Sequence, residues 1–164
     1  MSLAQFKDIR HFIFDIDGVL TNGQLLISVE GNLLRNMNIK DGYAMQLALK
    51  QGYTISIISG AREESILKRL AGLGIHDVHL GISQKLSKLE EIASNGQLSL
   101  PHTLYMGDDM PDLEVMKHVA LPCCPADACE EIIAASTYVS PKLGGQGCVR
   151  DVIEKVLKLN HHWQ

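Results

Sequence analysis

Short apolar runs alternate with amphipathic segments along almost the whole chain. The strand-like runs lie at 11–14, 53–58, 78–80, 103–106, 119–121 and 138–139. Segments with helical periodicity lie between them, at about 41–51, 62–73, 83–95, 110–118, 127–135 and 148–159. A chain in which strands and helices alternate in this way folds as an α/β protein. We therefore expect a doubly wound parallel sheet that is covered by helices on both faces.

One segment breaks this alternation directly after the first strand. Residues 24–29 and 33–39 are two extended stretches, and Glu30-Gly31-Asn32 joins them. This pattern is typical of a β-hairpin. Because 164 residues make one ordinary domain, we expect a single domain over 1–164. It would carry a hairpin insert at about 24–39 and a glycine-rich tail with a helix over 144–164.

The composition excludes several classes of protein. Lys and Arg number 15 against 19 Asp and Glu, so the net charge is −4 and no basic excess is available for nucleic acid. No run approaches the ~20 apolar residues that span a bilayer, and the first residues lack the apolar stretch of a signal peptide. The four cysteines have no zinc-site spacing. We expect a cytoplasmic protein without membrane insertion or a nucleic-acid partner.

Polar residues follow the predicted strands at the point where each strand ends. In open α/β sheets, the ligand crevice lies at this edge. The residues placed there are Asp15, Asp17, Ser59, Asp108 and Asp109, and Lys85 opens a following helix. On an extended chain Asp15 and Asp17 point to the same side. Carboxylates gathered in one site recruit a cation, and a ligand set of oxygens alone favours Mg²⁺.

This set of side chains suits the hydrolysis of a phosphate monoester. The uncatalysed reaction is among the slowest known, whereas a single acid or base contributes only about 10²–10⁴-fold. A site must therefore combine a nucleophile, a general acid and positive charge on the phosphoryl group. One carboxylate of the Asp15 and Asp17 pair can attack phosphorus while the other protonates the leaving oxygen. Ser59 and Lys85 can bind the phosphoryl oxygens, and Asp108 can hold the metal.

Four short motifs together resemble those of the haloacid dehalogenase superfamily of phosphohydrolases. They are the run FDIDGVLT at 14–21, Ser59, Lys85 and the run GDDMPD at 107–112. The resemblance implies that Asp15 is the nucleophile and a metal ligand, and that Asp17 is the acid/base and touches the metal through its backbone carbonyl. It implies that Asp108 is the third protein ligand. Asp109 and Asp112 would be supporting carboxylates that orient water and Lys85.

The spacing of the motifs leaves no room for a cap domain. Asp17 and Ser59 are 42 residues apart, and Ser59 and Lys85 are 26 apart. A site without a cap is open to bulk water unless something else covers it. The cap-less members that this chain resembles use a neighbouring subunit, and the resemblance implies a homotetramer built by the hairpin.

Within the superfamily, the runs TNG at 21–23, NIKDGY at 38–43 and GGQGCVR at 144–150, with the stretch from Gly81 to Lys85, most resemble one family. It is the family of 3-deoxy-D-manno-octulosonate 8-phosphate phosphatases, which act in lipopolysaccharide precursor synthesis. That resemblance implies substrate contacts at Asp17, Asn38, Lys40, Asp41, Gly42, Arg69, Lys85 and Arg150. It also places the glycine-rich tail near an adjacent active site, whereas the residues alone equally suit a flexible turn.

Two positions depart from that family, because Gln46 and Ala61 stand where it commonly has arginine. Arginine is suited to the two-point recognition of a sugar carboxylate. A nine-carbon ulosonate 9-phosphate therefore remains the alternative substrate. A phospho-receiver module and a structural subunit remain alternatives of other classes.

Overall fold

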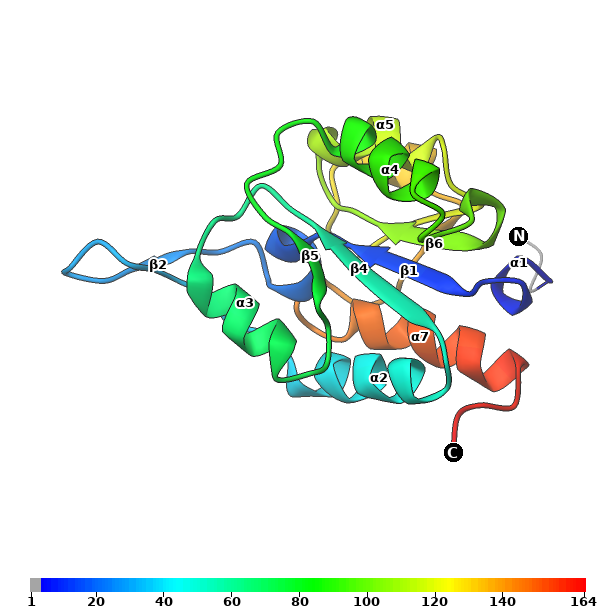
Figure 1. Ribbon diagram of the computed structural model, residues 1–164. Helices are drawn as coiled ribbons and strands as arrows, with labels where there is room; N and C mark the ends of the chain where they lie inside the picture. Colours follow the sequence, from blue (N-terminus) through cyan, green and yellow to red (C-terminus); the bar gives the residue numbers. More distant parts are fainter. Residues whose placement is uncertain (1–3) are drawn as a thin grey trace.

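The computed structural model describes residues 4–164 and has one parallel sheet of six strands between two layers of helices (Figure 1). The strand order is β5-β4-β1-β6-β7-β8. The strands are β1 (His11–Phe14), β4 (Thr54–Ile58), β5 (Asp77–His79), β6 (Thr103–Met106), β7 (Leu121–Cys124) and β8 (Tyr138–Val139). This arrangement confirms the predicted fold class.

The helices divide between the two faces of the sheet (Figure 1). One face is covered by α1 (Ala4–Lys7), α2 (Ile39–Lys50), α3 (Glu64–Ala71) and α7 (Cys148–Leu159). The other is covered by α4 (Lys85–Ser94), α5 (Leu113–Met116) and α6 (Glu130–Ala135). Three short helical turns complete the chain: η1 (Ile16–Leu20), η2 (Leu100–His102) and η3 (Met110–Asp112).

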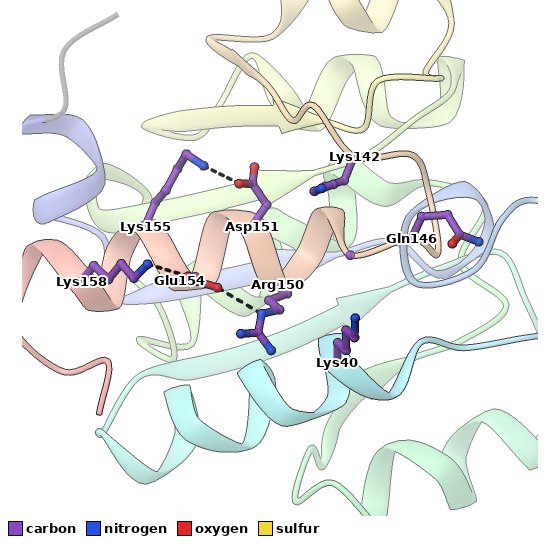
Figure 2. A pocket seen from close by; sticks show the side chains of 9 residues that line it. Lys40, Lys142, Gln146, Arg150, Asp151, Glu154, Lys155 and Lys158 are labelled. Carbon is purple, nitrogen blue, oxygen red and sulfur yellow. Dashed lines mark hydrogen bonds and ion pairs between the residues drawn. The ribbon is translucent and has the colours of Figure 1, made fainter.

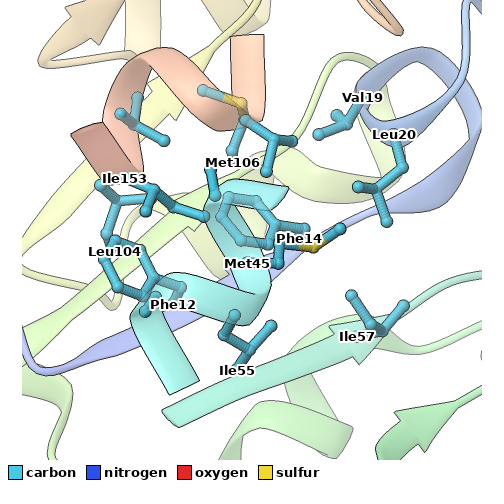
Figure 3. Close-up of a cluster of buried hydrophobic side chains, with 14 of the residues drawn as sticks. Phe12, Phe14, Val19, Leu20, Met45, Ile55, Ile57, Leu104, Met106 and Ile153 are labelled. Atoms are coloured by element: carbon cyan, nitrogen blue, oxygen red, sulfur yellow. The ribbon is translucent and has the colours of Figure 1, made fainter. Parts of the chain in front are cut away.

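Strand β1, in the middle of the sheet, is apolar on both faces. Phe12 and Phe14 point into the core beneath α2 and α7 (Figure 3), whereas Ile13 packs in the cluster on the opposite face. All three side chains are fully buried. Successive residues of a strand face opposite sides, so a sheet covered twice needs a continuous apolar run.

The sheet order places a crevice at the carboxyl end of β1. Strand β1 pairs in parallel with β4 on one side and with β6 on the other. The chain crosses over in opposite directions from this strand, so the connections leave a gap at its carboxyl end. The residues that follow Phe14, Ile58 and Met106 therefore meet at one edge.

The insert after β1 is a hairpin, as predicted, and projects from the body of the molecule (Figure 1). Its strands, β2 (Leu26–Ile27) and β3 (Leu33–Leu34), are antiparallel and pair Leu26 with Leu34. They are shorter than the predicted extended stretches, because most of the hairpin lies outside the core. Leu26 and Ile27 are each 68% exposed.

Outside the hairpin, three predicted elements differ from the observed bounds by three residues or more. The strand predicted at 119–121 is Leu121–Cys124; it includes Pro122, which has no N–H to donate but whose carbonyl accepts the N–H of Thr137. The helix predicted at 110–118 is only the turn η3 followed by α5, and the helix predicted at 127–135 begins at Glu130. The short helix α1 was not predicted.

The described residues contain no cap between the motif-bearing strands, in line with the prediction from motif spacing. Over residues 4–164, no helix has both the length and the apolar character needed to cross a membrane.

Candidate active site

The predicted catalytic residues meet in one cavity of about 390 Å³ at the carboxyl edge of the sheet. Its lining includes Asp15, Asp17, Ser59, Lys85, Asp108, Asp109 and Asp112. These residues follow β1, β4 and β6 or open α4, and are brought together only by the sheet.

Asp15 lies at the base of this cavity and is almost fully buried. Its Oδ1 accepts the N–H of Ile16 at 2.6 Å, and its Oδ2 is 2.7 Å from Lys85 Nζ. Burial raises the pKa of Asp15; the charge of Lys85 opposes this shift, and the charge of Asp112 adds to it. The carboxylate is thus held in one orientation with a cation beside it.

Lys85 bridges two carboxylates. Its Nζ lies 2.7 Å from Asp15 Oδ2 and 2.7 Å from Asp112 Oδ1, and its side chain is buried. Burial alone would lower the pKa of Lys85, but the charges of Asp15 and then Asp112 outweigh it and raise the pKa. Lys85 is therefore a fixed positive charge at the base of the cavity.

Asp112 accepts hydrogen bonds from four groups around the site. Its Oδ1 accepts hydrogen bonds from Lys85 and from the Tyr105 hydroxyl at 2.5 Å. Its Oδ2 accepts the backbone N–H groups of Asp108 and Asp109 at 3.0 and 3.4 Å. With four donors on two oxygens, this carboxylate has little capacity left for a metal. The supporting role expected of Asp112 fits these contacts.

Asp108 lies among other acidic groups, which disfavours its charged form. Carboxylate oxygens of Asp15, Asp108 and Asp112 lie within 4.8 Å of one another. Burial raises the pKa of Asp108 to about 7, and the charges of Asp15 and Asp112 contribute to the shift. Because Asp112 is already engaged, Asp15 and Asp108 are the side chains that fit Mg²⁺. The expected contact through the backbone carbonyl of Asp17 stays a prediction.

The chain keeps extended backbone angles at Asp15 and at Asp17, and both residues line the catalytic cavity. It enters the turn η1, where the Asp15 carboxylate caps the first N–H and Gly18 has φ of +81°. A Cβ on Gly18 would lie 1.9 Å from Asp108 Oδ2. The glycine is therefore required both by the backbone conformation and by the close approach of Asp108.

Two residues of the site, Arg35 and Tyr105, belong to no motif that the sequence reveals. Arg35 follows β3, and its Nε and Nη2 donate to the two carboxylate oxygens of Asp17 at 2.6 and 3.0 Å. Its Nη1 is 2.9 Å from Glu63 Oε2. Hydrogen bonding to Asp17 raises the pKa of Arg35 further above its usual value. Tyr105 was missed as well, because a hydroxyl in this strand is no distinctive signal: Thr103 carries one too.

Asp109 has a structural role at the rim of the site. It is exposed, and its Oδ1 accepts the N–H of Met110 at 2.8 Å. Asp109 and Asp112 form a reciprocal capping box around η3. This box fixes the loop that carries Asp108.

The glycine-rich tail packs against the catalytic turn of its own chain. A Cβ on Gly144 would lie 2.0 Å from the carbonyl oxygen of Gly18, and the N–H of Gly145 donates to Val19 O at 2.9 Å. Residues 144–147 form the predicted turn before α7, and this turn packs against η1. A contact of the tail with an adjacent active site stays a prediction.

Three of the predicted substrate residues serve the packing of α2. Asn38 caps this helix by accepting the N–H of Lys40 at 2.9 Å, and it donates to Gly145 O at 3.3 Å. Asp41 is buried and accepts the N–H of Arg150 at 2.7 Å. Gly42 lies so close to α3 that a Cβ would be 3.0 Å from Arg69 Nη2.

The predicted cationic contacts line other cavities. Lys40 and Arg150 border a cavity of about 540 Å³ between α2 and α7 (Figure 2). Arg69 borders a third cavity, beside β3. Within one chain, neither cavity shares a lining residue with the catalytic cavity. A sugar-binding role for these residues stays a prediction.

Comparison with known proteins places the chain in a family. The haloacid dehalogenase-like hydrolase family matches residues 74–150. The 3-deoxy-D-manno-octulosonate 8-phosphate phosphatase of Escherichia coli K12 is 34% identical over 155 residues, covering 94% of this chain and 82% of that protein. The chain belongs to this phosphatase family. Its members hydrolyse phosphoric monoesters and lie within the haloacid dehalogenase-like hydrolases.

Solved structures of this phosphatase family share the fold. The enzyme from Yersinia pestis superposes with a TM-score of 0.94 at 31% identity, covering 98% of this chain and 86% of that one. The enzyme from Moraxella catarrhalis, solved with a magnesium ion, a phosphate ion and KDO, gives a TM-score of 0.92 at 32% identity, with 96% and 90% coverage. The predicted family and cap-less fold are confirmed.

Proposed function

We propose that this protein is a Mg²⁺-dependent phosphatase that converts 3-deoxy-D-manno-octulosonate 8-phosphate to the free sugar acid and phosphate. The observation that carries the proposal is the Asp15–Lys85–Asp112 chain of ion pairs beside Asp108 in the catalytic cavity. The relatives named above act on this substrate, which supports its assignment here.

Asp15 is the nucleophile in this proposal. One of its carboxylate oxygens forms a bond to phosphorus while the ester oxygen leaves, which yields an aspartyl-phosphate. Lys85 beside it offsets the charge of the transferring phosphoryl group, and the Ser59 hydroxyl binds a phosphoryl oxygen. The fixed orientation of Asp15 by Ile16 N–H prepares it for attack.

Asp17 is the acid/base. It gives a proton to the leaving sugar oxygen, and it later takes one from the water that attacks the aspartyl-phosphate. The second step releases phosphate and restores the Asp15 carboxylate. The partly exposed side chain of Asp17 suits an exchange of protons with substrate and water.

Asp15 and Asp108, with the backbone carbonyl of Asp17, would hold Mg²⁺. When bound, the ion supplies positive charge to the phosphoryl oxygens and neutralises part of the carboxylate cluster. A divalent cation would offset the negative charge of the closely spaced carboxylate oxygens of Asp15 and Asp108.

The substrate's sugar would contact Lys40, Arg69 and Arg150, whereas Asn38, Asp41 and Gly42 would hold the start of α2 that carries Lys40. Because Lys40, Arg69 and Arg150 lie outside the catalytic cavity of their own chain, we assign them to the cover that a second subunit provides. The exposed apolar hairpin supports self-association, and we expect a cytoplasmic homotetramer that acts in lipopolysaccharide precursor synthesis. Ala61 at the rim of the cavity keeps a nine-carbon ulosonate 9-phosphate as the alternative substrate.

The test is phosphate release over many turnovers from the eight- and nine-carbon ulosonate phosphates. We expect Asp15→Asn to lower kcat by at least about 10⁴-fold, because the amide is not a nucleophile. The melting temperature should change little. Asp8→Asn, an exposed residue before β1, is the matched control and should retain full activity.

Retained turnover in Asp15→Asn would contradict the assignment of the nucleophile. A single turnover that stops at a phosphorylated Asp15 would instead identify a phospho-receiver module.

A further inference from the structure

Arg35 is a buried cation that the hairpin delivers to the catalytic residues. Its side chain is only 7% exposed. Two of its nitrogens donate to both oxygens of Asp17, at 2.6 and 3.0 Å. The remaining nitrogen, Nη1, makes no hydrogen bond among the described residues, although Glu63 Oε2 is 2.9 Å away as an ion-pair partner. This guanidinium therefore already binds a carboxylate in the two-point geometry that arginine favours.

The catalytic cavity is short of positive charge for an anionic substrate. Among the described residues that line it, Lys85 is the only lysine or arginine, against five carboxylates. Lys85 is committed to Asp15 and Asp112. A sugar-acid phosphate brings a phosphate and a carboxylate, so the carboxylate needs a cation outside this lining. Arg35 is ion-paired with Asp17, a residue of that lining, and lies on the side of the acid/base.

Arg35 also borders a cavity not described above, the hairpin cavity, which lies at the base of the hairpin and has a volume of about 550 Å³. The amide residues Asn22, Gln24 and Asn36 line it, together with three leucines of the hairpin, Leu25, Leu26 and Leu34. Amides can donate to and accept from sugar hydroxyls. Asp17 lines the catalytic cavity and Arg35 lines the hairpin cavity, so the Asp17–Arg35 pair lies between these two cavities.

We propose that Arg35 determines specificity by binding the carboxylate of the sugar acid, which replaces Asp17 as its partner. The sugar would then extend from Asp17 toward the amides at the base of the hairpin. This inference rests on the proposed function, because it requires a phosphate ester whose alcohol carries a carboxylate. The exchange also frees both oxygens of Asp17, which must be released before either can carry a proton to the leaving group.

The test compares two substrates of the full-length protein with Mg²⁺. One is 3-deoxy-D-manno-octulosonate 8-phosphate, and the other is an aldose phosphate without a carboxylate, such as arabinose 5-phosphate. The readout is the ratio of kcat/KM for the first to that for the second. We expect Arg35→Ala and Arg35→Gln to lower this ratio at least tenfold, mainly through a higher KM for the carboxylate-bearing substrate. Arg35→Lys should restore part of it, because a point charge replaces the two-point contact.

Two further variants serve as controls. Arg10→Ala removes an exposed guanidinium before the amino end of β1 and should leave the ratio at the parent value. Glu63→Gln removes the carboxylate that competes for Arg35, and Arg35 itself keeps its positive charge. The ratio should therefore be equal to or above that of the parent.

The possible failures are distinguishable. An equal loss on both substrates in Arg35→Ala and Arg35→Gln, or a ratio equal to the parent's, would overturn the role of Arg35 while leaving the proposed function intact. A parent protein with no preference for the carboxylate-bearing substrate would overturn the proposed function itself.

Discussion

At the scale of single residues, the site depends on how closely backbone and carboxylates approach one another. Gly18 lies directly beneath Asp108, and Gly107 lies where a Cβ would be 2.3 Å from Asp112 Cγ. Each glycine gives a carboxylate the space to turn toward the cavity. The catalytic geometry thus depends on missing side chains as much as on those present.

Gly18→Ala tests this dependence. The methyl group would collide with Asp108, and a φ of +81° is strained for alanine by ~1–3 kcal/mol. We expect a lower melting temperature and a several-fold higher Mg²⁺ concentration for half-maximal activity, because Asp108 is displaced. Gly31→Ala is the matched control, because Gly31 has φ of +82° but no atom within 4 Å of the new Cβ. A change in the Mg²⁺ requirement that is equal in both variants would exclude the steric explanation.

At the scale of elements, the contact of α2 with α7 depends on a buried carboxylate. Asp41 in the first turn of α2 accepts the N–H of Arg150, and so it caps α7 from another helix. Burial raises the pKa of Asp41 to about 6, although hydrogen bonds from the backbone of Arg150 and Gly147 oppose the shift. The protein therefore holds a charge that it would accommodate better as the neutral acid.

This arrangement predicts a pH-dependent stability. A carboxyl whose pKa is raised on folding favours the folded state below its unfolded pKa, and this contribution is lost as the pH rises through about 6. Asn at this position stays neutral throughout. The free energy of unfolding of Asp41→Asn, relative to the parent, should therefore rise by up to about 3 kcal/mol between pH 4 and pH 8. Denaturant unfolding at both pH values measures it, and a constant difference would contradict the raised pKa.

The tail is likewise a core element. Six residues of α7 are fully buried against the sheet: Cys148, Val149, Val152, Ile153, Val156 and Leu157. At ~1.5–3 kcal/mol for each large apolar side chain, their burial is comparable with the whole stability of a small domain. Residues 144–164 thus hold the fold together, and any role in covering an active site would be additional.

At the scale of the whole molecule, the hairpin carries an unusual amount of exposed apolar surface. Leu25, Leu26, Ile27, Val29 and Leu34 are between 44% and 101% exposed. Exposed apolar side chains gathered on one projecting hairpin favour a role in interaction. In the proposed assembly these side chains pack against the hairpins of other copies.

Negative charges introduced into the hairpin should dissociate the proposed tetramer into monomers. We expect the double variant Leu26→Glu with Ile27→Glu to be monomeric by sedimentation at concentrations where the parent is a tetramer, because burying two carboxylates in an apolar interface is costly. Its kcat/KM for the sugar-acid phosphate should fall at least tenfold if a second subunit completes the site. Leu67→Glu, on the exposed face of α3, is the control that should remain associated. A monomeric parent, or full activity in the monomer, would exclude the shared site.

Local signals predicted that the proposed catalytic residues meet at one edge of the sheet, but they did not predict the surroundings of these residues. Asp15, Ser59, Lys85 and Asp108 each follow or precede a strong strand or helix pattern, so their meeting at one edge follows from the topology of a parallel sheet. Arg35 and Glu63 come from loops and have no such register. The contacts of Arg35 with Asp17 and with Glu63 depend on how the hairpin folds back onto the sheet, which no periodicity encodes.

By itself, the sequence determined the alternating α/β order, the absence of room for a cap and the acidic cluster with one lysine. These are properties of spacing and residue type, and they hold for any arrangement of a doubly wound sheet. Only the tertiary structure decided that Asp112 is saturated by four donors, that Gly144 packs on the catalytic turn and that Arg35 holds Asp17. Those contacts join residues distant in the chain, and their energies depend on distance, direction and burial.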